Sequence, residues 1–169
     1  MSVLKKIRVV EFAEGVPGPL AALRLSDLGA DVIKVETRDG DWLRHAAPAL
    51  PDSHMSAAFF ELNRGKRSVV LDLRDDAERE RFHRLLETAD VMITNMRPAA
   101  LERLGLDHES VCARHPSLVY GSLTGYGLDG PDRDRAGYDI GAFWARSGVA
   151  HTIVPPGELP PDLLSGFGD

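Results

Sequence analysis

The side chains best suited to chemistry are basic residues that stand beside short apolar runs. Arg38 follows one such run, Lys66 directly precedes another, and Arg97 and Arg103 follow a third. Guanidinium and ammonium groups bind phosphate oxygens through charge-assisted hydrogen bonds, so together these residues suit a ligand with several phosphates. Charged loop residues are also commonly just solvated. From the residues alone, both interpretations stay open.

Two carboxylates lie in glycine-containing turns. Glu14 comes directly after the first apolar run, and this position makes it an acid/base candidate. Asp169 follows residues 166–168, Gly-Phe-Gly, and small neighbours let a substrate approach a carboxylate closely. An aspartate in a glycine-rich loop is, however, most often a turn former. The residues themselves therefore do not single out Asp169.

Several other motifs carry less weight. Residues 125–130 match G-x-G-x-x-G, but a dinucleotide site needs a helix to begin there and Pro131 follows, so a turn is expected. The six histidines show no spacing typical of a zinc site with a cysteine, and no metal is expected. Cys112 lies in an expected helix and fits a small core residue, and Ser165 lacks the G-x-S-x-G context of a nucleophile.

Composition limits the class of protein. The chain has 169 residues, of which 43% are hydrophobic and 27% charged, as expected for one globular domain over 1–169. A net charge of −6 argues against a nucleic-acid partner. One cysteine excludes an internal disulfide and favours the reducing cytoplasm. The first residues do not resemble a signal peptide, and no run has the length of a membrane span, so no membrane partner is expected.

The opening stretch predicts the element that positions the first turn. Residues 7–12 are apolar and β-branched, as in a buried parallel strand. Pro19 suits the first turn of a helix, and Gly29 suits its end. Residues 32–36 then form a second strand, which completes a βαβ unit. The turn before the helix offers free backbone N–H groups where open α/β sheets bind ligands.

The rest of the chain continues the alternation. Further strands are expected at 68–73, 90–95 and 117–123, and helices at 57–62, 75–89, 98–104, 107–114 and 138–147. The stretch from 37 to about Met55 is expected to be irregular, and prolines dominate 151–161. This order predicts an α/β fold with a Rossmann-like, open, mostly parallel sheet and helices on both faces.

Several stretches, taken in order, resemble the family III CoA-transferases, the group that includes formyl-CoA transferase, carnitine CoA-transferase and the α-methylacyl-CoA racemases. These stretches are 10–12 with 18–19, 28–36, 63–68 with 71–73, 90–91 with 95–98, 104–105, and 125–127 with 130–131. One of them alone would be a weak signal. The ordered set covers nearly the whole chain and is specific.

The resemblance implies a CoA-transferase, which moves CoA from an acyl-CoA to a carboxylic acid. In this family an aspartate after a glycine attacks the thioester, and an anhydride and then an aspartyl-CoA thioester form. Asp169, after Gly168, matches that nucleophile. The implied CoA contacts are Val16, Pro17, Arg38, Asn63, Lys66, Asn95, Met96, Arg97 and Arg103.

Tyr138 stands where the family's racemases carry a histidine. A tyrosine has a reference pKa of about 10 and is no proton shuttle near pH 7. The resemblance therefore favours a transferase, in which a tyrosine at this place positions substrate beside the aspartate. A racemase or isomerase with another base, and a non-catalytic CoA-binding or dimerisation module, remain alternatives.

Length is the main departure from the family. Its members are more than twice as long, with a second, smaller domain, a C-terminal return segment and two interlocked chains. The resemblance thus implies that residues 1–169 are the N-terminal part of the CoA-binding domain. It also implies a homodimer for the full-length protein and no turnover by the fragment.

Overall fold

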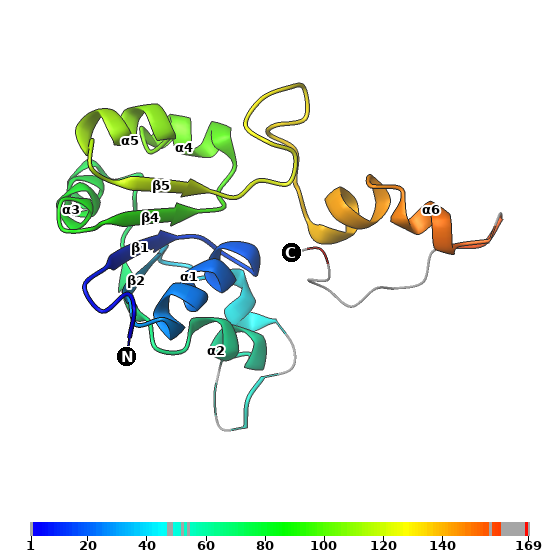
Figure 1. The fold of residues 1–169 in the computed structure, drawn as a ribbon, viewed down its shortest axis with the longest axis horizontal. Helices are drawn as coiled ribbons and strands as arrows, with labels where there is room; N and C mark the ends of the chain where they lie inside the picture. Colours follow the sequence, from blue (N-terminus) through cyan, green and yellow to red (C-terminus); the bar gives the residue numbers. More distant parts are fainter. Residues whose placement is uncertain are drawn as a thin grey trace.

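The computed structural model describes residues 2–46, 49–51, 53, 55–155, 157–159 and 168. A five-stranded sheet forms its centre (Figure 1). The strands are β1 (Arg8–Phe12), β2 (Asp31–Glu36), β3 (Arg67–Val70), β4 (Val91–Thr94) and β5 (Val119–Ser122), all parallel in the order β3-β2-β1-β4-β5. The order reverses between β1 and β4, as in doubly wound folds. The expected α/β class is confirmed.

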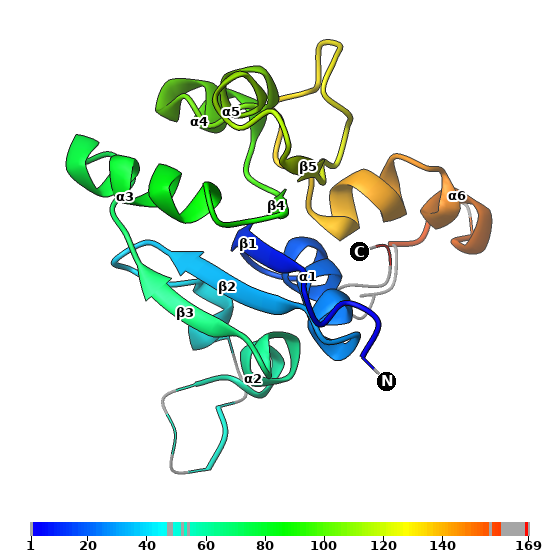
Figure 2. The ribbon, with the colours of Figure 1, turned by 60° about the vertical axis from the view of Figure 1, so that its left-hand side comes forward.

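Helices cover both faces of the sheet (Figures 1 and 2). On one side lie α1 (Pro17–Asp27) and α2 (Ala57–Asn63), and on the other lie α3 (Asp76–Leu86), α4 (Pro98–Leu104) and α5 (His108–Arg114). Alternation along β1 separates two cores: Val9 packs with the α1 side, whereas Val10 packs with the α3 side. A sheet buried on both faces explains why its central strands are almost continuously apolar.

Helix ends follow local sequence signals. Pro17 and Pro19 lie in the first turn of α1, and Gly29 follows its end with φ of 97°. The side chain of Asp107 accepts the Ser110 N–H at 3.0 Å and caps α5, as expected. Among the residues that the structure describes, no helix is long and apolar enough to cross a bilayer.

The strand expected at 68–73 is shorter and lies at 67–70, and the structure also differs from expectation in three other short segments. The stretch expected to be irregular contains a 3-10 helix, η1 (Trp42–His45), because Asp41 caps it by accepting the Leu43 N–H. Most of the helix expected at 138–147 is a π-helix, η2 (Ile140–Ala145). A further short helix, α6 (Val149–Ile153), runs into the proline-rich region. In Figure 1, η2 and α6 extend beyond the carboxyl edge of the sheet.

Two buried histidines join α3 to the end of α5. His83 Nδ1 lies 3.1 Å from His115 Nε2, and the rings are stacked with centroids 5.4 Å apart. Burial lowers the pKa of both imidazoles, and the nearby Arg114 guanidinium adds to this effect. One ring must donate and the other accept, so the pair requires at least one neutral imidazole.

Stability is therefore expected to fall as the pH drops below about 6.5, the pKa of an unfolded histidine. Below that pH the histidines of the unfolded chain bind protons, whereas His83 and His115 in the folded protein bind fewer because their pKa values are lower. Above that pH the histidines are neutral in both states. The slope should reach at most about 1.4 kcal/mol per pH unit for each histidine. Urea unfolding at pH 7.5, 6.5 and 5.5 measures it. The double variant His83→Leu/His115→Leu should lose this dependence, and an equal slope in both proteins would contradict the assignment.

Candidate functional site

The turn after β1 meets the loop after β4 where the strand order reverses. The side chain of Asn95 holds this junction: its Oδ1 accepts the Glu14 N–H at 2.9 Å and its Nδ2 donates to the Glu14 carbonyl at 2.7 Å. Gly18 allows α1 to begin close to the strand, since a Cβ there would lie 2.4 Å from the Ala13 Cβ. Ligands of open α/β sheets bind at such a reversal.

Several predicted binding residues share this carboxyl edge. They are Val16 and Pro17 after β1, Arg38 after β2, and Asn95, Met96 and Arg97 after β4. Arg97 is exposed, and no hydrogen bond or ion pair to its guanidinium occurs among the described residues. Arg38 pairs loosely with Glu78 at 3.3 Å and stays exposed. Arg103 lies in the last turn of α4, where its Nε donates to the Ala99 carbonyl at 3.2 Å.

Two other predicted binding residues lie elsewhere. Asn63 and Lys66 precede β3, at the opposite end of that strand. The Lys66 ammonium lies 2.7 Å from Glu11 Oε2 and donates to the Pro19 carbonyl and to Asn63 Oδ1. Burial lowers the pKa of Lys66, and the Glu11 carboxylate acts in the opposite direction. The charge of Lys66 is thus already paired within the fold.

A buried ionic network supports the turn from below. The Lys34 ammonium lies 2.9 Å from Glu11 Oε1 and 3.0 Å from Asp41 Oδ2, and all three side chains are almost completely buried. Lys34 also donates to the Ala13 carbonyl at 2.7 Å, and Asp41 accepts the Gly15 N–H at 3.1 Å. The network therefore ties β1, β2 and the start of η1 to the backbone of the turn between β1 and α1 (residues 13–16), called the ligand-edge turn below.

Another buried carboxylate, Glu36, stabilises the loop after β2. Both oxygens of Glu36 accept hydrogen bonds from Arg44 at 2.7 Å, and Ser68 Oγ donates at 2.7 Å. Burial alone would raise the pKa of Glu36, but these hydrogen bonds and the Asp41 N–H lower it to about 2. The Arg44 guanidinium also lies over the Phe59 ring, 4.0 Å from its centroid. Glu36 and Arg44 are therefore structural ions.

The region expected to hold the reacting groups follows β5. Tyr138 is 69% exposed, whereas the next residue, Asp139, is buried at the start of η2. Oδ1 of Asp139 accepts the Gly168 N–H at 2.7 Å. The predicted nucleophile, Asp169, lies outside the described residues. The structure thus joins the Tyr138–Asp139 step to the residue before Asp169, a contact that sequence reasoning missed.

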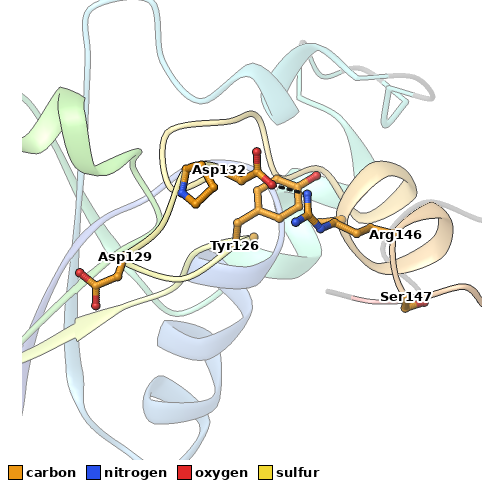
Figure 3. A pocket seen from close by; sticks show the side chains of 8 residues that line it. Tyr126, Asp129, Asp132, Arg146 and Ser147 are labelled. Carbon is orange, nitrogen blue, oxygen red and sulfur yellow. Dashed lines mark hydrogen bonds and ion pairs between the residues drawn. The ribbon is translucent and has the colours of Figure 1, made fainter.

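The G-x-G-x-x-G match forms a loop, as expected, and no helix begins at it. Gly125 and Gly137 cross at its base, where a Cβ on Gly125 would lie 2.5 Å from the Gly137 Cα. A pocket of about 420 Å³ lies between this loop and η2 (Figure 3). Arg146 pairs with Asp132 across it and lies 5.0 Å from the centroid of the Tyr126 ring. Two of the charged groups that line it, Arg146 and Asp132, are thus engaged with each other.

No cluster of three or more His, Cys, Asp or Glu side chains in the described part of the chain is arranged to hold a metal ion. Among the described residues, this edge offers the exposed guanidinium of Arg97 and an apolar turn, and in the sequence Asp169 follows Gly168. These groups could bind a phosphorylated ligand and present it to a nucleophile.

Comparisons with known proteins give a consistent result. A family model described as CoA-transferase family III matches residues 4–169. The chain is 39% identical to cinnamoyl-CoA:phenyllactate CoA-transferase of Clostridium sporogenes, over 96% of this chain and 40% of that protein. It is 45% identical to succinate–glutarate CoA-transferase of Agrobacterium fabrum, over 80% of this chain and 36% of that protein. A crystal structure of a CAIB/BAIF family protein from Brucella suis matches with a TM-score of 0.86 and 40% identity, over 96% of this chain and 43% of that one. The chain spans about two fifths of the length of these relatives.

Proposed function

The chain belongs to CoA-transferase family III, and from this premise we propose that its full-length protein moves CoA from an acyl-CoA to a carboxylic acid. The observation that carries the proposal is the match over residues 4–169 together with the edge at which β1 and β4 diverge. CoA is the substrate in this proposal, and no metal takes part.

CoA is proposed to lie along the carboxyl edge of the sheet. The phosphates bind Arg38, Arg97 and Arg103, and the pantetheine arm passes Val16, Pro17 and Met96. Arg97 supports this placement because its guanidinium is exposed and has no partner in the described residues. Asn95, Asn63 and Lys66 act by holding the turn and α1 in place, since their side chains already bind the fold.

The proposed chemistry is covalent and starts at Asp169. Its carboxylate attacks the thioester carbonyl, the C–S bond breaks, and CoA leaves as the thiolate with a mixed anhydride left behind. The thiolate then attacks the aspartyl carbonyl, which releases the donor acid and leaves an aspartyl-CoA thioester. The acceptor carboxylate attacks this thioester in turn, and the thiolate returns to the acceptor's acyl carbon. Tyr138, exposed beside Asp139, positions the carboxylic acid.

The assembly follows the same premise. Residues 1–169 are the N-terminal part of the CoA-binding domain, and the full-length protein is a cytoplasmic homodimer. The acyl-CoA and the acceptor acid are its partners, and neither nucleic acid nor a membrane takes part.

The test uses the full-length protein with an acyl-CoA donor and an acceptor acid. CoA transfer is expected, and hydroxylamine added with the donor should convert Asp169 to a hydroxamate that mass spectrometry detects. Asp169→Ala should abolish both. Transfer by Asp169→Ala at the normal rate would overturn the assignment. So would exchange of the α-proton of a 2-methylacyl-CoA without transfer, which indicates a racemase, or CoA binding without turnover, which indicates a binding module.

A further inference from the structure

An aromatic side chain lines the ligand-edge turn and has no role in the mechanism above. The Trp42 indole packs on Gly15, where a Cβ would lie 2.9 Å from the indole Cζ2. Asp41, directly before it, is buried and binds both the Gly15 N–H and Lys34, so the backbone that carries the indole is fixed. Trp42 is nevertheless 47% exposed. An indole that packs against a fixed backbone on one side and is half exposed on the other is suited to contact an apolar ligand group.

The residues next to this indole extend the apolar surface. Val16 and Pro17 follow Gly15 directly, are partly exposed, and lead into α1. These two residues and Trp42, which contacts Gly15, are here called the apolar rim of the turn. The thioester end of CoA must pass this rim if the pantetheine arm follows the proposed path.

Glu14 gives the same turn a negative charge with no counter-ion. Its carboxylate has no hydrogen bond or ion pair within the described ranges of the chain, although its backbone is held by Asn95. The cations beneath the turn are already engaged: Lys34 with Glu11 and Asp41, and Arg44 with Glu36. Burial and the Asp41 carboxylate raise the pKa of Glu14. When Glu14 is ionised it repels a second carboxylate brought to this turn, and the cations directly beneath the turn are already paired.

From these observations we infer that the transferred acyl group is apolar and lacks a terminal carboxylate. Trp42 is the wall that contacts this group, and Glu14 excludes a charged end. Burying a methylene chain against the indole is favourable, whereas placing two carboxylates together in a partly desolvated turn is not. Such a site achieves specificity by attracting one substrate class and repelling the other. This inference rests on the proposed CoA transfer and adds a substrate class to it.

The first test compares butyryl-CoA with succinyl-CoA, which have four acyl carbons each and differ by one terminal carboxylate. With the full-length protein and propionate as the acceptor acid, kcat/KM should be at least about tenfold higher for butyryl-CoA. An equal or higher value for succinyl-CoA would overturn the substrate class and leave CoA transfer intact. Transfer from neither donor, nor from acetyl-CoA, would overturn the proposed function and this inference with it.

Two variants test the residues separately. Glu14→Gln should raise kcat/KM for succinyl-CoA about tenfold and change that for butyryl-CoA less than twofold, because only the charge is removed. Trp42→Ala should raise KM for butyryl-CoA about tenfold and that for acetyl-CoA less than threefold, and Trp42→Phe should restore most of the difference. A general loss of folding would instead affect all donors equally. If Glu14→Gln left the donor ratio unchanged, or if Trp42→Ala affected both donors alike, the inference would be wrong.

Binding gives an independent measurement. Trp42 and Trp144 are the two tryptophans of residues 1–169, and Trp144 is buried. Saturating butyryl-CoA should change the tryptophan emission of the Trp144→Phe variant and should not change that of Trp42→Phe. Other tryptophans of the full-length protein contribute equally to both variants. The reverse pattern would contradict a contact between the acyl group and Trp42.

Discussion

Lys34→Met is expected to lower the free energy of unfolding by about 3–5 kcal/mol. The ammonium of Lys34 is 1% exposed and lies between the Glu11 and Asp41 carboxylates. Its removal leaves Asp41 without a cation and Glu11 with Lys66 alone, in a region that water does not reach. An uncompensated buried charge costs far more than a pair contributes.

The matched control is Arg67→Met, which removes a cation from the neighbouring strand. Arg67 pairs with Asp31 at the surface, so its loss should cost less than about 1 kcal/mol. Urea unfolding of both variants and the parent at pH 7.5 gives the comparison. If Lys34→Met and Arg67→Met differed by less than 1 kcal/mol, the network would be solvated and the structural argument would fail.

Lys34→Met should also weaken CoA binding under conditions in which the variant is still folded. Asp41 holds the Gly15 N–H, and Lys34 holds the Ala13 carbonyl, so the network fixes both sides of Glu14. In this protein the buried ions therefore position the turn that is proposed to contact CoA.

Much of the fold follows from signals that act within a few residues. The apolar run of β1, the proline at the start of α1 and the Asp107 cap each act locally, and the structure confirms all three. The carboxyl edge was also predictable, because parallel strands place their following loops together. What the sequence alone does not reveal is pairing between distant residues.

The buried network shows this limit. Glu11 and Lys34 interrupt apolar strands, which is a visible signal of a buried ion pair, but their contact depends on the register that places them opposite each other. From the sequence, Lys66 looks like a free phosphate ligand for the same reason, because its ionic partner Glu11 is 55 residues away in the chain. Its other side-chain partner, the Asn63 amide, is near in the sequence but does not neutralise the charge. Only the packed structure shows that its charge is already paired.

The contact between η2 and Gly168 leaves no room for a side chain. A Cβ on Gly168 would lie 2.3 Å from both Asp139 Oδ1 and Phe143 Cγ. The Gly168 N–H donates to the same Asp139 oxygen, so the backbone is held from one side and confined on the other. In the proposed mechanism this geometry sets the direction from which the next residue, Asp169, reaches the thioester.

Gly168→Ala is therefore expected to lower kcat for CoA transfer about 100-fold, because a displacement of about 1 Å at a nucleophile has an effect of this size. Gly141→Ala is the matched control, since a Cβ there would lie 3.9 Å from its nearest neighbour, the Tyr126 hydroxyl. Asp139→Asn keeps an oxygen acceptor for the Gly168 N–H and should retain more activity than Asp139→Ala. Steady-state kinetics with one donor and one acceptor, and CoA affinity by calorimetry, separate the outcomes: CoA should bind all four variants normally. If Gly168→Ala stayed within threefold of Gly141→Ala in kcat, the confined glycine would have no part in presenting the nucleophile.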